Sequence, residues 1–525
     1  MIGDILLGLA SICNVPSIGA IALGVLTGLV FGAIPGISGI MAISILLPMT
    51  FYVSPLVGIP MLLGIYKASM FGGSITAILL NTPGAPPAVC TAMDGYPLAR
   101  EGKAGKALNA ALTGSVFGDA FSNILLICVA APLSWLTLKV GPVEQCALII
   151  LAMTVVGSIS GSSIVKGCIC AGAGVLLATV GVSGTTGATR FTFGLTEFMA
   201  GIALIPMVIG LLCLPEVIHQ ACTGIRKTAL RRFSLKGPDG TLSWAEIKSR
   251  LPLLLRSSII GSCIGALPGL GASPAAYMAY SEARRTSKDP QKFGHGEISG
   301  VMAPEAANNA VTGSAMIPLL TLGIPGDDVT AVLMGAFLIQ GITPGPNIFF
   351  ENTVVVYGIF GSLIVCDILL YVIAKAGFRL WIRITELPKS LIFSTVTVFA
   401  FVGTYSINQS LFDVFCLICF GVLGYGMRRF QFPAGPMIIG FILGPLLEAA
   451  FDQTMTLSDG SFLIFLERPV ALGLLLLACA AIFSIGRARL RASALVRLAQ
   501  ADQALIHKSE PTRPDEMSGS RVWLK

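Results

Sequence analysis

Two long apolar stretches of this chain are interrupted by residues that break helices. The stronger one runs from Ala303 to Pro346 and reads APEAANNAVTGSAMIPLLTLGIPGDDVTAVLMGAFLIQGITPGP, and a weaker counterpart surrounds Gly72. Lipid cannot hydrogen-bond the backbone groups that a break leaves unpaired, so a break at membrane depth has to line a protein-buried or water-filled cavity. The two stretches therefore predict where a functional cavity lies.

The composition indicates that the chain lies in a lipid bilayer. Of its 525 residues, 54% are hydrophobic and only 12% are charged, too few polar residues to cover the surface of a soluble globule. A spanning helix needs about 20 apolar residues. We therefore predict an all-α polytopic membrane protein with about twelve transmembrane helices.

The net charge of +7 is unevenly distributed. Eight basic residues lie between positions 226 and 256, and four more follow the last apolar run between positions 487 and 497. Basic loops next to spanning segments favour the cytoplasmic side. This placement explains the charge without a nucleic-acid partner and predicts a basic cytoplasmic connector at 226–256.

A ladder of small residues occurs twice and ends both times in Pro-Gly. Small residues at every fourth position share one helix face and let another backbone approach closely. The sequences GAIPGIS and GALPGLG close the two ladders 233 residues apart. The ladder positions are Gly24, Gly28, Gly32 and Gly36 in the first copy, and Ser257, Gly261 and Gly265 before Pro268-Gly269 in the second.

A second pair of landmarks follows the ladders in the same order. FGGSITAILLNTPG and VTGSAMIPLLTLGIPG place Gly-Ser and Pro-Gly at offsets of 240 and 242 residues. These landmarks predict an internal duplication, with two homologous repeats, which we expect to be inverted, built on broken helices or hairpins. The expected division is 1–225 for the first half, 226–256 for the connector, 257–490 for the second half and 491–525 for a polar tail.

Three longer motifs resemble a known family. DGYPLAREGKAGKAL, PEAANN and TLGIPGD are similar to the large membrane subunit of the tripartite tricarboxylate transporters, the TctA type, and the similarity extends to about Leu490. The resemblance implies a permease of the bacterial inner membrane that imports organic carboxylates, with citrate as the usual substrate. It also implies a small membrane subunit and a periplasmic solute-binding protein as partners, and a Na⁺ or proton gradient as the driving force. The chain has no GxxxxGK[ST] loop to hold a nucleotide phosphate, and we expect no cofactor other than Na⁺ as the coupling ion.

Candidate substrate-binding residues come from the breaks and from polar residues beside them. Pro removes a backbone donor and Gly permits unusual dihedral angles, so a break exposes N–H groups that suit a carboxylate. A structural kink, interhelical hydrogen bonding by the amides, or a serine bonding its own helix are the competing interpretations. The candidates are Ser38, Ser74, Asn81, Thr82, Pro83, Gly84, Asn308, Asn309, Ser314 and Gly326.

Candidate ligands for the coupling ion are the acids and free carbonyls at the breaks. Asp327 and Asp328 directly follow Pro325-Gly326 and could bind Na⁺, carry a proton or simply cap the next helix. The full set is Gly36, Gly269, Gly323, Asp327 and Asp328.

Three further features have no settled role in the sequence. Lys67 lies in an apolar run, where it could attract an anion or extend its amine to the membrane interface. Pro304-Glu305 has the pattern of a helix start. Asp94–Pro97 is typical of a turn in a loop or gate.

Two other classes of protein remain as alternatives. A stand-alone carboxylate carrier or a channel would lack the binding-protein dependence, and a channel needs a continuous polar pore rather than duplicated breaks. A membrane-embedded enzyme is less favoured, because no HExxH or GxSxG motif occurs. We therefore expect a transporter with no catalytic residues.

Overall fold

The computed structural model of the chain is built almost entirely from α-helices. It describes residues 2–34, 37–159, 163–184, 186–223, 241–384 and 389–483. Its first part contains the elements α1 (Ile2–Ile12), α2 (Val15–Gly32), α3 (Gly39–Leu46), η1 (Leu47–Tyr52), α4 (Pro55–Leu80), α5 (Ala88–Arg100), α6 (Ala104–Thr137), α7 (Pro142–Ile159), α8 (Ile164–Ala178), β1 (Gly181–Val182), β2 (Thr189–Arg190), η2 (Thr196–Ala200), α9 (Leu204–Leu212) and α10 (Leu214–Thr223).

The part after residue 240 is also helical. It contains α11 (Trp244–Ser249), α12 (Leu251–Gly265), α13 (Ala272–Thr286), η4 (Pro290–Lys292), α14 (Ile298–Ser314), α15 (Met316–Leu322), α16 (Asp328–Ile339), α17 (Ile348–Glu351), α18 (Thr353–Ala376), α19 (Phe378–Ile384), α20 (Lys389–Asn408), α21 (Leu411–Arg429), α22 (Ala434–Leu457), α23 (Ile464–Glu467) and a last apolar helix at Pro469–Phe483.

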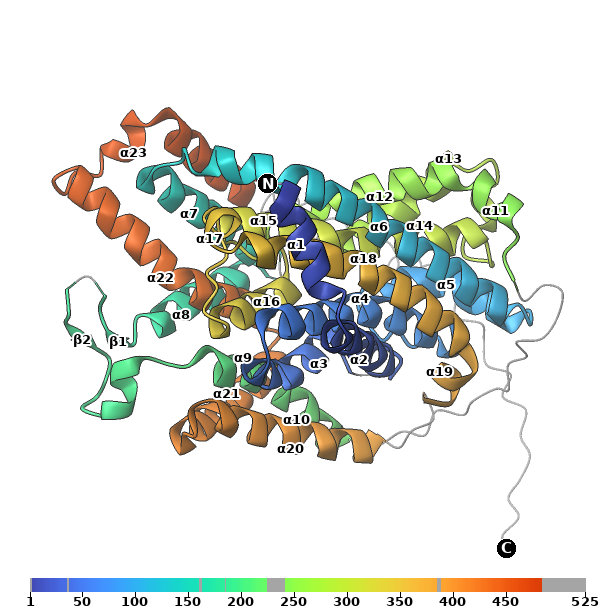
Figure 1. Cartoon of the computed structure of the whole chain (residues 1–525), viewed down its shortest axis with the longest axis horizontal. Helices are drawn as coiled ribbons and strands as arrows, with labels where there is room; N and C mark the ends of the chain where they lie inside the picture. The colour runs from blue at the N-terminus through green and yellow to red at the C-terminus, as the bar shows by residue number, and fades with distance from the viewer. Residues whose placement is uncertain are drawn as a thin grey trace, which may run out of the picture.

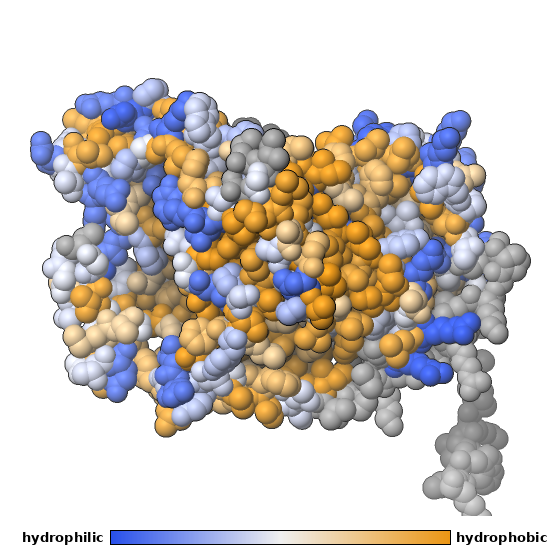
Figure 2. Space-filling view, viewed as in Figure 1, coloured by the Kyte–Doolittle hydropathy of each residue, from blue (hydrophilic) through white to orange (hydrophobic). Residues whose placement is uncertain are grey.

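The surface supports a membrane location. In Figure 2, hydrophobic side chains form a broad central zone, and hydrophilic residues gather towards the two ends of the long axis. Helix α11 lies at one end of this axis, and the β1–β2 hairpin lies at the other (Figure 1). The molecule therefore has the apolar middle and polar ends of a polytopic membrane protein.

The expected number of about twelve spans is not confirmed. Among the described residues, 7 helices are long and apolar enough to cross a bilayer, and several other apolar helices have only 10–17 residues. The division into two homologous halves stays a prediction. Residues 251–256 of the predicted connector belong to α12, and the tail at 491–525 lies outside the described residues.

Helix α4 lies at the centre of the first part. Nearly every residue from Gly58 to Leu79 is buried, which fits a helix that carries mostly apolar or small residues on every face. The first glycine ladder packs α2 against it: a Cβ atom added to Gly28 would lie 2.5 Å from the carbonyl oxygen of Ile65. The ladder thus brings the two backbones together, as its spacing predicts.

The second ladder packs α12 against α14 in the same manner. A Cβ atom added to Gly265 would lie 2.9 Å from Cα of Val311. Helix α6 packs on another face of α14, where a Cβ atom on Gly118 would lie 2.8 Å from the carbonyl carbon of Ala306. Helix α14 therefore has close backbone neighbours on two sides.

The predicted breaks at Pro83-Gly84 and Pro325-Gly326 both interrupt the helices. Helix α4 runs unbroken through Gly72 and ends at Leu80, where Asn81 adopts a left-handed conformation with φ of 52°. Helix α15 ends at Leu322, where Gly323 has φ of 69°, and α16 begins after Asp327. The second break is buried from Gly323 to Asp327, whereas the first is exposed at Asn81 and Thr82.

Two local predictions were wrong. Asp94–Pro97 is not a turn but lies inside α5, where a Pro in the last turn is accommodated. Pro304-Glu305 is not a helix start but lies inside α14, which begins at Ile298 with Glu297 as its N-cap. In both cases tertiary packing outweighs the local preference of Pro for the first turn.

We predict that Gly28→Leu destabilises the protein while Gly19→Leu does not. The added side chain at Gly28 meets the backbone of α4, whereas a Cβ atom at Gly19 has no atom within 4 Å. Overpacking costs about 1–3 kcal/mol or more. Thermal unfolding of the two purified variants would measure the difference, and equal midpoints would contradict the α2–α4 packing.

Candidate functional site

A cavity of about 330 Å³ lies where four helices begin. Its lining includes Ile40 near the start of α3, Pro87 before α5, Ser273 in the first turn of α13 and Asp328 at the start of α16. This volume falls in the range of about 300–1,000 Å³ found for small-molecule sites. The segments that line it follow all four predicted Pro-Gly landmarks.

The helix starts give the cavity its electrostatic character. The first N–H groups of a helix have no partner within the helix and carry partial positive charge. Helix α13 begins after Gly271, whose φ is 68° and which provides no side-chain cap. Its first turn therefore offers N–H groups of the kind that bind carboxylates and phosphates.

The two breaks of the second part are fastened to each other. The N–H of Gly269 donates to the carbonyl oxygen of Gly326 over 2.7 Å. Gly269 needs its flexibility here, because its φ is 83°. This bond keeps the loop before α13 beside the loop before α16 and so fixes one wall of the cavity.

Asp327 caps α16, as one of the sequence interpretations predicted. Its Oδ1 accepts from the N–H of Thr330 over 2.7 Å and from the Thr330 hydroxyl over 2.8 Å. Its Oδ2 accepts from the hydroxyl of Tyr66 over 2.5 Å. Both oxygens are thus engaged, and the Tyr66 bond ties the start of α16 to α4.

Asp328 is the freer of the two neighbouring acids. Its side chain is exposed and lines the cavity. Its carboxylate also lies near the start of α22, since a Cβ atom added to Gly435 would be 2.6 Å from Cγ of Asp328. No hydrogen bond to this carboxylate is found within the described part of the chain, so Asp328 can bind a ligand.

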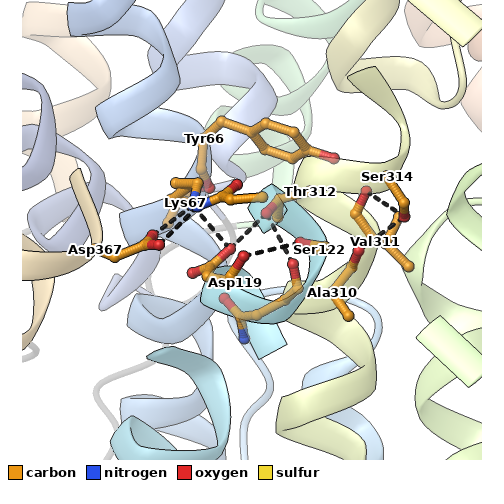
Figure 3. A network of polar contacts seen from close by, with 12 residues as sticks. Tyr66, Lys67, Asp119, Ser122, Ala310, Val311, Thr312, Ser314 and Asp367 are labelled. Carbon is orange, nitrogen blue, oxygen red and sulfur yellow. Dashed lines mark hydrogen bonds and ion pairs between the residues drawn. The ribbon is translucent and has the colours of Figure 1, made fainter. Parts of the chain in front are cut away.

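A charged cluster is completely buried between α4, α6 and α18. Figure 3 shows Lys67 between Asp119 and Asp367. The Lys67 amine lies 3.3 Å from Oδ1 of Asp119 and also contacts Oδ1 of Asp367. Lys67 is fully buried, so it does not extend to the membrane interface, and its two ion-pair partners are both carboxylates.

Glu305 forms a second buried polar cluster. Its Oε1 accepts from the hydroxyls of Ser74 and Thr91, and its Oε2 accepts from that of Ser115 over 2.7 Å. The three hydroxyls come from α4, α5 and α6, and Glu305 comes from α14. The carboxyl group therefore links four helices and has no basic partner among the described residues.

Only some of the predicted substrate-binding residues lie near the cavity. Ser38 caps α3 by accepting from the N–H of Met41 over 3.3 Å, and the loop from Pro83 reaches the cavity at Pro86 and Pro87. Gly326 faces Ala315 and bonds Gly269. Asn81 and Thr82 are exposed at the end of α4, outside the lining.

The other candidates lie in helix–helix contacts rather than in the cavity wall. Ser74 bonds Glu305, and Ser314 bonds the backbone of its own helix at Ala310 over 2.7 Å, as the structural interpretation predicted. Asn309 donates to the carbonyl oxygen of Glu305 over 3.0 Å. Asn308 is buried, and neither amide atom has a hydrogen-bond partner in the described structure. Gly84 packs on Gly73, to which its N–H donates over 3.1 Å.

The candidate ion ligands are likewise divided. Gly269, Asp327 and Asp328 share the cavity. Gly323 lines a separate cavity of about 460 Å³ next to Pro344. Gly36 lies outside the described residues.

The sequence interpretation missed Tyr66, Asp119, Asn123 and Asp367. A signal existed for the two acids, because a carboxylate within an apolar run marks a functional site by default, and Asp119 and Asp367 lie in such runs. The pairing of these acids with Lys67 was not predictable, since 300 residues separate Lys67 from Asp367.

Asp94 has an anchoring role that no motif revealed. Its Oδ1 accepts from the N–H groups of Gly294, Gly296 and Glu297 over 2.8–2.9 Å. Its Oδ2 accepts from the Tyr280 hydroxyl over 2.8 Å. The carboxylate thereby fixes the loop before α14 to α5.

We predict that Lys67→Met destabilises the protein strongly. It leaves two buried carboxylates without a cation, and breaking a buried pair in this way costs about 3–5 kcal/mol. The double variant Lys67→Met/Asp367→Asn should recover part of the loss. Thermal unfolding measures both, with Lys375→Met as the control because Lys375 lies exposed near the end of α18. A Lys67→Met protein as stable as the control would contradict the ion cluster.

We also predict that Asp94→Ala destabilises the protein more than Tyr280→Phe. The first change removes the acceptor of three backbone N–H groups and one hydroxyl, and hydrogen bonds to a charged group contribute about 1.5–3 kcal/mol each. The second change removes a single bond. The order of the two unfolding midpoints tests this, and the reverse order would exclude Asp94 as the anchor of the loop.

Comparison with known proteins places the chain among bacterial relatives without an established function. A protein of Agrobacterium vitis described as an uncharacterized 52.8 kDa protein in the TAR-I ttuC' 3' region is 39% identical over 462 residues, which cover 87% of this chain and 91% of the relative. An uncharacterized protein in the TAR-II ttuC' 3' region of the same organism is 41% identical over 215 residues, 41% of this chain and 89% of the relative. No solved structure matches.

The family itself is identified by a match over most of the chain. The model of the tripartite tricarboxylate transporter TctA family matches residues 18–439, a range that includes the cavity and both buried clusters. This match confirms the family resemblance carried by the motifs at Asp94 and Glu305. The chain therefore belongs to the tripartite tricarboxylate transporter TctA family, a family of membrane transporters.

Proposed function

We propose that this chain is the large permease subunit of a binding-protein-dependent secondary transporter in the bacterial inner membrane. It imports tricarboxylates or related organic carboxylates, and a Na⁺ or proton gradient drives the uptake. The family supports the transport role. The cavity at the helix starts supports the substrate class.

The observation that carries this proposal is the convergence of helix N-termini on one cavity. Helices α3, α5, α13 and α16 all begin at its wall. Ser38 and Asp327 cap α3 and α16, whereas α5 and α13 have no side-chain cap, and each of these two starts favours a negative group by about 0.3–1 kcal/mol. A di- or tricarboxylate can place different carboxylates at different starts. Transporters with broken helices bind anionic substrates in this manner.

The coupling ion has a role at the same cavity. Asp328 and Asp327 bring negative charge to the wall, and this charge opposes an anionic substrate unless a cation is present. A Na⁺ ion or a proton at Asp328 neutralises it, so that substrate and cation bind together. This requirement provides a physical basis for symport.

The match to the tripartite family supports the proposed partners. A small membrane subunit joins the chain in the bilayer, and a periplasmic solute-binding protein delivers the carboxylate. The only sheet in the described residues is the two-stranded β1–β2 hairpin. The basic residues near α11 and α12 favour the cytoplasm for that end of the molecule, which leaves the β1–β2 end towards the periplasm (Figure 1).

Uptake into proteoliposomes tests the proposal. The chain is reconstituted with its small subunit and binding protein, each added or omitted, under an imposed Na⁺ or proton gradient, with labelled citrate, a dicarboxylate and an aromatic acid as substrates. We expect uptake of one of these acids that requires both partners and stops when one gradient is removed.

The Asp328→Asn variant tests the site itself. We predict a loss of uptake of roughly ten-fold or more, because the variant removes a charged contact worth about 1.5–3 kcal/mol. Asp459→Asn is the matched control, since Asp459 is exposed in a turn at φ of 49°, a conformation that Asn adopts readily. Unchanged uptake in Asp328→Asn would remove Asp328 from the site.

Other results would favour the alternative functions. Uptake by the chain without its partners indicates a stand-alone carboxylate carrier, and movement only down the substrate gradient indicates a channel. Chemical conversion of the acid would indicate a membrane-embedded enzyme. Each of these results would overturn the tripartite proposal.

A further inference from the structure

The buried cluster around Lys67 carries one negative charge too many. Lys67, Asp119 and Asp367 together contribute one positive and two negative groups, and all three are buried. Lys67 is the only cation within ion-pair distance of either carboxylate among the described residues. An uncompensated charge at such a position is costly, so the cluster favours a second cation.

Three oxygen atoms beside the cluster have no partner. They are Oδ2 of Asp119, Oδ1 of Asn123 and Oδ1 of Asn309, each buried and without a hydrogen bond in the described structure. Buried polar atoms are normally satisfied by protein, water or an ion. Three buried acceptors without a protein partner therefore suit a ligand that offers positive charge.

Packing of α6 against α14 brings the three side chains together. Asp119 and Asn123 are four residues apart and share a face of α6. The Thr312 hydroxyl of α14 donates to Oδ1 of Asp119 over 2.5 Å and to the carbonyl oxygen of Asn309 over 2.8 Å. Asn309 therefore lies one helical turn from the residue that touches Asp119 (Figure 3 shows the Asp119–Thr312 contact).

Glycine contacts above and below Asn309 support this placement. On one side, Gly118 packs against Ala306, where a Cβ atom would be 2.8 Å from the Ala306 carbonyl carbon. On the other side, a Cβ atom on Gly313 would be 2.9 Å from Oδ1 of Asn123. Asn309 lies between Ala306 and Gly313 in the sequence of α14, and so within this close seam.

We propose that Asp119, Asn123 and Asn309 form a Na⁺ site between α6 and α14. Carboxylate and amide oxygens are ligands for hard cations, and one monovalent ion brings the cluster to neutrality. A transition metal does not fit, because the set has a single carboxylate, and no group of three or more His, Cys, Asp or Glu that could hold a metal occurs in the described structure.

The site deepens the proposed function, because it adds a second cation site to the one at Asp328, and its role in coupling rests on that function. Lys67 and Tyr66 are neighbours on α4: Lys67 contacts Asp119, and Tyr66 donates to Asp327 at the carboxylate cavity. An ion at Asp119 changes the charge that Lys67 balances. Helix α4 carries both Lys67, which contacts Asp119, and Tyr66, which contacts Asp327. Na⁺ and substrate thereby act on the same segment of one helix.

Na⁺-dependent stability of the purified full-length chain tests the site without any transport. Thermal unfolding is followed while Na⁺ replaces choline at constant ionic strength, with K⁺ in parallel and at two pH values. We expect a saturable rise in the unfolding midpoint with Na⁺, since a ligand of the native state stabilises it in proportion to its occupancy. K⁺ should give a much smaller rise.

Variants assign the effect to these residues. Without substrate, Asp328 has no anion beside it that requires a cation, so Asp119→Asn should abolish the Na⁺ response. Asn123→Ala and Asn309→Ala should each raise the half-maximal Na⁺ concentration at least about ten-fold. Asp413→Asn is the control, because Asp413 is another buried acid. It accepts a hydrogen bond from Asn408 of α20 and is far in the sequence from Asp119 and Asn309. If Asp119→Asn does not fold, the two alanine variants carry the test.

The outcomes separate this inference from the proposed function. A midpoint that rises with acid but not with Na⁺ would show that a proton fills the site and would overturn the Na⁺ assignment, as would an unchanged Na⁺ response in all three variants. Na⁺ binding that depends on the three residues, without carboxylate uptake by the reconstituted system, would uphold the site and refute the proposed transport.

Discussion

The burial of Lys67 with two carboxylates is the constraint on which the centre of this protein depends. A lysine inside an apolar structure is retained only if charged partners surround it, and its partners come from α6 and α18. The preceding residue, Tyr66, joins α4 to α16 through its hydrogen bond to Asp327. Two consecutive side chains thus set the positions of three helices around α4.

Close backbone packing makes these polar contacts achievable. The glycine ladders remove the side chains that would hold α2 from α4 and α12 from α14, and helices that approach closely gain van der Waals contact in place of the hydrophobic effect. Short hydroxyl side chains such as Ser74 and Ser115 can then reach Glu305 from adjacent helices. Small residues and buried charges therefore act together in this fold.

Much of the local architecture was predictable because it depends on residues close together in the sequence. The helical class follows from long apolar runs, the close seams from glycines spaced by four, and the breaks from Pro-Gly pairs. Asp327 was recognisable as a cap because the cap and Thr330 are three residues apart. The twelve predicted spans were less secure, since several apolar helices are too short to count by length alone.

The polar clusters were not predictable in the same way. Glu305 has the local pattern of a helix start, yet its carboxyl group meets hydroxyls 190 to 231 residues away, and only the tertiary structure shows this. Asp94 lies in what reads as a turn, but its partners on α13 and before α14 hold it in a helix. Residues whose role depends on distant partners were the ones that sequence patterns described wrongly.

The anchor at Asp94 has a consequence for how the protein can move. Because one carboxylate accepts from three amides of a glycine-containing loop and from Tyr280, hydrogen bonds connect α5, α13 and the start of α14 at a single point. A loop with Gly294 and Gly296 at positive φ would otherwise be an obvious hinge, and here it is locked. Other glycines at positive φ have open space around them and no such anchor, among them Gly271, Gly341 and Gly345, and at these positions a change of backbone angle would meet no packed atom.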